Sequence, residues 1–184
     1  TAALLAFALA RPFVESAPTA AAAAGGNAKT TVVVLDATWP MGFEIEGETL
    51  LDRARFQADN LLSELSGRSA LVVAGDSVAA PLEEPTGAAD TARRYLEGVE
   101  LSQRYGTLPD AIARAYEMLA SEPGQRRVVV LTTAAAASSS LPRPPPATSG
   151  DAIELVPINV SAGVDTPNRA VLDVQLRPAP QLGE

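Results

Sequence analysis

The sequence predicts a single α/β domain built on a doubly wound, mostly parallel sheet with helices on both faces. Two observations carry this prediction. Short β-branched apolar runs recur along the chain, and stretches with helical apolar spacing lie between them. Such alternation is typical of a parallel sheet that helices cover on both sides. With 184 residues, the chain is long enough for one domain with a substantial core.

Each element follows from a local pattern. Strands buried on both faces are continuous apolar runs, and these occur at 30–35, 69–74, 127–132 and 153–158, with 77–80 as a short hairpin partner of the second run. Apolar residues at helical spacing predict helices over 49–65, 90–99 and 108–120. Thr49 and Asp52 form an approximate capping box for the first helix. Residues 134–150 are expected to be a polar, low-complexity loop.

The two ends differ in composition from the domain. The sequence begins without Met, and residues 1–12 start with ten uncharged residues before Arg11-Pro12. We expect this segment to be the end of a truncated transmembrane helix, the alternatives being part of a signal peptide or a core helix. Residues 13–29 are expected to be a flexible spacer. After the 30–160 domain, residues 161–184 are expected to form a strand and a linker toward a missing C-terminal region.

The composition excludes several classes of function. The chain has no Cys and no His, which rules out disulfides, zinc-cysteine sites, iron-sulfur clusters and mechanisms that use an imidazole base. The net charge is −8, and the basic residues form no cluster larger than a pair such as Arg93-Arg94. Binding to a phosphate backbone depends on many cationic contacts, so we expect no nucleic-acid partner.

Three short motifs resemble parts of catalytic sites without their context. Residues 25–30 end in Lys-Thr like a phosphate-binding loop, but they precede a strand instead of following one. Gly-Asp-Ser at 75–77 matches the nucleophile block of some lipases, whose chemistry needs a histidine base, so we expect a turn between strands. Glu-Glu at 83–84 lies in polar loop sequence and is expected to be solvated.

Residues 32–42 (VVVLDATWPMG) resemble the first strand and the following loop of a von Willebrand factor type A (vWA) domain. In that family an apolar strand ends in Asp-x-Ser-x-Ser, usually followed by Met, and the side chains coordinate Mg²⁺. Asp36 matches the Asp, Thr38 the first hydroxyl and Met41 the Met. Pro40 stands where the second hydroxyl is expected. The resemblance implies a Rossmann-like vWA fold with a degenerate metal-ion-dependent adhesion site.

Two further positions support this interpretation of the site. A later strand of the family ends in Thr-Asp-Gly, and here Thr133 replaces the Asp. Thr107 is the nearest equivalent of a third hydroxyl, but we favour for it the role of N-cap of the helix that follows. Mg²⁺ needs near-octahedral oxygen ligation and usually more than one carboxylate or phosphate. We therefore expect Asp36, Thr38 and Thr107 to form only a weak or empty metal site, with no cofactor required.

The flanking segments resemble membrane-anchored bacterial proteins of the aerotolerance-regulator type, which carry two N-terminal transmembrane helices. The resemblance implies a domain that is tethered to the membrane through an upstream helix and lies on the periplasmic side. The leading hypothesis is a non-catalytic protein-interaction or scaffold module. We expect its protein partner to contact Trp39, Pro40, Met41, Phe43 and Thr133, at the carboxyl end of the sheet.

Other interpretations remain open at this point. An equally weighted alternative is that Trp39 and Phe43 fold back onto the core. The site is alternatively that of a Mg²⁺-dependent vWA ligand-binding domain. A phosphatase-like hydrolase with Asp36 as nucleophile is a further alternative, but such enzymes usually have a second Asp two residues on, where Thr38 stands, and a later lysine, whereas Lys29 precedes the strand. A purely structural assembly domain has the same sequence pattern.

Overall fold

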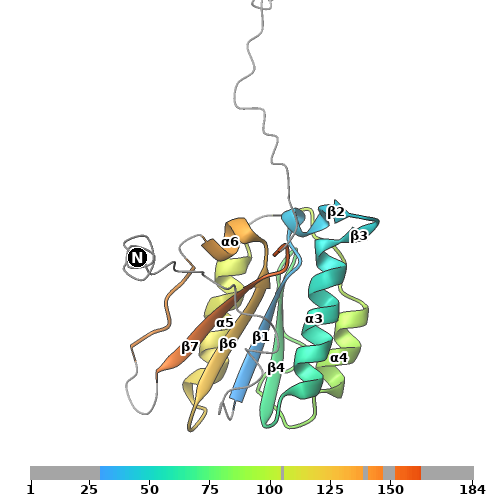
Figure 1. Ribbon diagram of the computed structural model, residues 1–184. Helices are drawn as coiled ribbons and strands as arrows, with labels where there is room; N and C mark the ends of the chain where they lie inside the picture. Colours follow the sequence, from blue (N-terminus) through green and yellow to red (C-terminus); the bar gives the residue numbers. More distant parts are fainter. Residues whose placement is uncertain (1–29, 105, 139–140, 147–151, 163–184) are drawn as a thin grey trace, which may run out of the picture.

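A computed structural model describes residues 30–104, 106–138, 141–146 and 152–162 of the chain (Figure 1). One sheet of five strands has the order β5-β4-β1-β6-β7. The strands are β1 (Thr30–Asp36), β4 (Arg68–Ala74), β5 (Val78–Ala79), β6 (Arg126–Thr132) and β7 (Ile153–Asn159). β5 pairs antiparallel with β4, and all other pairs are parallel. The predicted α/β class, with its mostly parallel sheet, is confirmed.

The central strands are buried on both faces because their apolar runs have no polar interruption. In β1, Val33 and Leu35 belong to one core, whereas Val32 and Val34 belong to the other. Side chains alternate across a strand, so a continuous apolar run serves two cores at once. This explains why the strand segments were predictable from composition alone.

Helices cover both faces of the sheet. On one face lie α3 (Leu50–Glu64) and α4 (Asp90–Glu97), and on the other lies α5 (Leu108–Ala120) (Figure 1). α3 begins with the predicted capping box. The Thr49 hydroxyl accepts a hydrogen bond from the backbone N–H of Asp52, and the Asp52 carboxylate accepts one from the backbone N–H of Thr49.

Two short regions differ from the sequence prediction. A 3-10 helix η1 (Trp39–Gly42) and a small hairpin of β2 (Glu44–Ile45) and β3 (Glu48–Thr49) precede α3. The hairpin turns at Glu46 and Gly47, both with positive φ, as a two-residue turn requires. The prediction of a loop over residues 134–150 is wrong at its start, because residues 134–138 form the helix α6 (Ala134–Ser138). Its four alanines have the highest helix propensity of any residue.

The expectations for both ends of the chain concern residues that mostly lie outside the described ones. Segments 1–12 and 13–29 are outside entirely, and of 161–184 only residues 161 and 162 are described. Within the part of the chain that the structure describes, no helix has the length and apolar character that crossing a membrane requires.

Candidate functional site

The candidate site lies at the carboxyl ends of β1 and β6, around the carboxylate of Asp36. Asp36 is the last residue of β1 and is only 2% exposed. Its Oδ1 accepts hydrogen bonds from the backbone N–H of Thr38 at 3.0 Å and from the Thr38 hydroxyl at 2.6 Å. Its Oδ2 accepts a hydrogen bond from the Thr132 hydroxyl at 2.5 Å. Donors from the protein itself therefore reach both oxygens of the buried carboxylate.

Thr132 is a site residue that sequence reasoning missed. The parallel register aligns Leu35 of β1 with Leu131 of β6, so the next residues, Asp36 and Thr132, meet at the same sheet edge. The sequence signal that could have identified Thr132 is its position at the end of a buried strand, directly before the expected loop. The register itself, however, depends on pairing between segments that are far apart in sequence.

Thr107 and Thr133, two further residues of the predicted site, form their hydrogen bonds with groups other than Asp36. The Thr107 hydroxyl donates to the carbonyl oxygen of Gly75 at 2.9 Å, and it makes no capping bond to α5 although Thr107 is the N-cap residue. The capping role expected for its side chain is therefore wrong. The Thr133 hydroxyl accepts from the backbone N–H of Ala136 at 3.4 Å, at the start of α6. Asp36 and Thr38 come together as expected, while neither of these threonines bonds to Asp36 in the structure.

A loop that follows α4 closes over this edge of the sheet. The backbone N–H of Ser102 donates to the carbonyl of Ala37 at 2.8 Å, and its hydroxyl donates to the exposed carboxylate of Asp76 at 2.5 Å. The Ser102 oxygen also accepts from the backbone N–H of Arg104 at 2.9 Å, and the carbonyl of Arg104 accepts from the backbone N–H of Trp39 at 3.4 Å. The start of η1 is thus fixed to the loop through backbone groups.

The exposed apolar surface beside this edge consists of Trp39, Pro40 and Phe43, which we call the sheet-top patch. Trp39 is 45% and Phe43 43% exposed, and Pro40 is also exposed. Met41, which the sequence placed with them, is 0% exposed and belongs to the core under α3. Its assignment as a partner-contacting residue is therefore wrong. A single 3-10 turn directs Met41 inward and leaves its neighbours at the surface.

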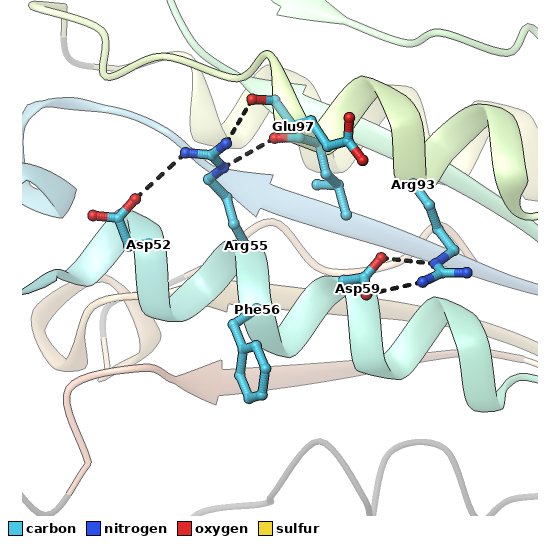
Figure 2. Close-up of a pocket in the computed structure, with 7 residues that line it drawn as sticks. Asp52, Arg55, Phe56, Asp59, Arg93 and Glu97 are labelled. Atoms are coloured by element: carbon cyan, nitrogen blue, oxygen red, sulfur yellow. Dashed lines mark hydrogen bonds and ion pairs between the residues drawn. The ribbon is translucent and has the colours of Figure 1, made fainter.

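Ion pairs line an open groove of about 460 Å³ between α3 and α4 (Figure 2). The guanidinium of Arg93 donates to both carboxylate oxygens of Asp59, at 2.7 and 3.0 Å, and these bonds lower the pKa of Asp59. Arg55 donates to the carbonyls of Leu96 and Glu97 at the C-terminus of α4. Ligand pockets are mostly apolar, so this polar groove is better explained as the joint between the two helices.

Oxygen donors for a metal are few. Among the described residues, no group of three or more Asp, Glu, His or Cys side chains is arranged to hold a metal ion. At the predicted site, Asp36 contributes one carboxylate, and Pro40 lacks the hydroxyl expected at its position. The chemistry of the donor set therefore differs from the multi-carboxylate, octahedral ligation that Mg²⁺ prefers.

The chain resembles known proteins in structure, at low sequence identity. The sequence matches no protein-family profile and no curated protein. An aerotolerance-related membrane protein from Bacteroides fragilis is 19% identical, with a TM-score of 0.52, and the match covers 76% of each chain. BatB from Bacteroides thetaiotaomicron is 21% identical, with a TM-score of 0.49, and the match covers 55% of this chain and 52% of BatB, about half its length.

A third solved structure, the VWA domain of SpRpn10, is 13% identical with a TM-score of 0.47, and the match covers 73% of this chain and 90% of that domain. The likeness to the Bacteroides fragilis protein concerns the fold, because the identity is low. It agrees with the strand order described above. The chain therefore has a doubly wound, mostly parallel α/β fold, as the sequence predicted.

Proposed function

We propose that this chain is a non-catalytic protein-interaction module of the vWA type, and that its partner docks on the sheet-top patch. The observation that carries the proposal is the outward position of Trp39 and Phe43 on either side of the buried Met41. Aromatic side chains are enriched at the energetic centres of protein interfaces. The backbone ties through Ser102 and Arg104 hold the patch in place, which lowers the entropy lost on binding.

The geometry around Asp36 supports a role without catalysis. A nucleophilic carboxylate must present a free oxygen to its substrate, whereas Asp36 is buried and accepts hydrogen bonds at both oxygens from Thr38 and Thr132. We infer that this carboxylate instead joins the ends of β1 and β6. In this role Asp36 is not available as the nucleophile that the hydrolase alternative requires.

The proposal also includes a degenerate metal site, so that partner binding does not depend on Mg²⁺. The reason is the donor set. Asp36 is the one carboxylate of the predicted site, Pro40 has no side-chain oxygen, and the Thr107 hydroxyl is engaged by the carbonyl of Gly75. A Mg²⁺-dependent vWA domain is the alternative. Calorimetric titration with Mg²⁺ decides between them, because micromolar affinity that Asp36→Ala abolishes would contradict the degenerate site.

Membrane tethering on the periplasmic side completes the proposed function. It rests on the resemblance of residues 1–12 to the end of a transmembrane helix, and on the likeness in fold to a protein described as an aerotolerance-related membrane protein. Protease accessibility of the domain in intact and in permeabilised spheroplasts tests the location. Cleavage in the intact spheroplasts is expected, and protection until permeabilisation would place the domain on the other side.

Site-specific photocrosslinking tests the sheet-top patch directly. A photoreactive phenylalanine analogue is placed at position 39 or 43 of the chain in its native membrane context. The matched control places it at Phe56 of α3, which is 68% exposed and lies away from the sheet edge. We expect one protein to crosslink from positions 39 and 43 and not from 56. Equal crosslinking from all three positions would contradict the assignment of the patch.

A further inference from the structure

A proline-rich segment between α6 and β7 forms a second distinctive surface, separate from the sheet-top patch. Residues 141–146 read Leu-Pro-Arg-Pro-Pro-Pro, and they form neither helix nor strand. The segment runs past the side of the sheet as the orange trace between α6 and β7 (Figure 1). Arg143, Pro145 and Pro146 are exposed, while Leu141, Pro142 and Pro144 are half-buried.

The covalent structure of this segment restricts its conformation. Every residue from 141 to 146 either is a proline or precedes one. Proline fixes φ near −65°, and a residue before proline is confined to extended or polyproline II conformations. A polyproline II helix has three residues per turn, so positions 141 and 144 share one edge and 143 and 146 share another. The burial follows this period on two of the three edges, because the first pair is half-buried and the second pair is exposed; on the third edge, position 142 is half-buried and position 145 is exposed.

The domain anchors the segment at its beginning. Leu141 packs against the core under α5. The hydroxyl of Tyr116, from α5, donates a hydrogen bond to the carbonyl oxygen of Pro142 at 2.8 Å. The anchoring leaves the face with Arg143, Pro145 and Pro146 toward solvent. Four of the six residues lack a backbone N–H, so no strand can pair with them through a regular ladder, but their carbonyls still accept hydrogen bonds.

We propose that residues 141–146 are a preformed polyproline II ligand for a partner domain whose groove is lined by aromatic side chains and bordered by carboxylates. Aromatic grooves recognise proline rings in this conformation, and the stiff segment loses little entropy on binding. The acidic border follows from Arg143, which is exposed and forms no ion pair with any described residue. This second interaction surface is independent of the sheet-top patch, since different elements carry the two.

Titration of the intact chain with purified polyproline-binding domains tests the proposal. The probes are a WW domain and a polyproline-binding Src-homology domain with an acidic pocket, each followed by fluorescence anisotropy. We expect at least one probe to bind with micromolar affinity. The double variant Pro144→Ala, Pro145→Ala should weaken that binding by about tenfold, because it removes both the rings and the conformational restriction. Arg143→Gln should weaken it severalfold and reduce its dependence on salt.

A matched control separates this effect from a general loss of prolines. Pro123 is exposed in the connection between α5 and β6, and Pro123→Ala should leave the affinity unchanged. Circular dichroism should show a single cooperative melting transition for all variants, with at most a small shift for the proline substitutions. The proposal is overturned if neither probe binds the chain, or if binding persists at full strength in the double proline variant.

Discussion

The hydroxyl of Thr132 donates a buried 2.5 Å hydrogen bond to Oδ2 of Asp36, and this bond joins the carboxyl ends of β6 and β1. The remaining carboxylate oxygen is held by Thr38. The position that resembles a metal ligand is thus a point where two neighbouring strands are fixed to each other. The stability of the sheet edge and the chemistry of the candidate site therefore depend on the same three side chains.

Thr132→Val tests this relationship because valine keeps the shape and removes the donor. The variant leaves one oxygen of a buried carboxylate without its partner, which we expect to cost about 1.5–3 kcal/mol of the free energy of unfolding. Urea denaturation measures it. Thr91→Val is the control, since Thr91 is exposed on α4. Equal, small effects of both substitutions would mean that Asp36 does not depend on Thr132.

Met41→Ala and Phe43→Ala are expected to separate the buried anchor of the η1 turn from the exposed sheet-top patch. Met41 is fully buried, so its truncation should lower the free energy of unfolding by about 2–5 kcal/mol. Phe43 is 43% exposed, and its truncation should cost about 1 kcal/mol or less. Thermal denaturation measures both. A larger loss for Phe43 than for Met41 would indicate that the aromatic side chain belongs to the core instead.

The capping box of α3 predicts a defined pH dependence. A hydrogen bond from the side chain of Thr49 lowers the pKa of Asp52 below its usual 3.8. Because the folded pKa is depressed, the contribution to stability is present above pH 3.8 and is lost as the pH falls through the lower folded value. Thr49→Ala should raise the pKa of Asp52, which an NMR titration of the carboxyl carbon follows. The pKa of Asp59, which Arg93 lowers, should stay unchanged in the same spectra.

Tyr116 predicts a change at the alkaline end. Burial raises the pKa of Tyr116 from 10.0 to about 12. Because the folded pKa is raised, the neutral hydroxyl contributes stability that is fully present below pH 10.0 and is lost as the pH rises through about 12. Tyr116→Phe should remove this decline, together with the bond to Pro142. The measurement is the difference in urea stability between the two proteins across that range, and parallel curves would refute the assignment.

The strands and the main helices could be predicted from the sequence because their signals are local. Residues 32–35 of β1 are apolar without interruption, and α5 has the bounds that its apolar spacing indicated. The partner of Asp36 could not be predicted in this way, because Thr132 reaches it only through the register of two strands that lie far apart in sequence. The same holds for Thr107, whose hydroxyl bonds to Gly75 and not to its own helix.

The direction of Met41 was the least predictable part of the site. Residues 39–43 are mostly apolar, and this pattern does not indicate which side chain is buried. The burial of Met41 depends on the single 3-10 turn and on the space under α3. The resemblance to the vWA motif predicted the position of the loop correctly. Only the structure shows which residues of the loop are buried.

The inward anchor at Met41 also bears on how such a module can change over evolutionary time. Stability constrains the identity of the fully buried Met41 strongly, because its replacement destabilises the fold. It constrains the exposed side chains beside Met41 only weakly. Trp39 and Phe43 are therefore open to replacement while the turn that presents them is retained. If the proposed function holds, one inherited scaffold changes its binding preference by exchanging Trp39 and Phe43, at little cost in stability.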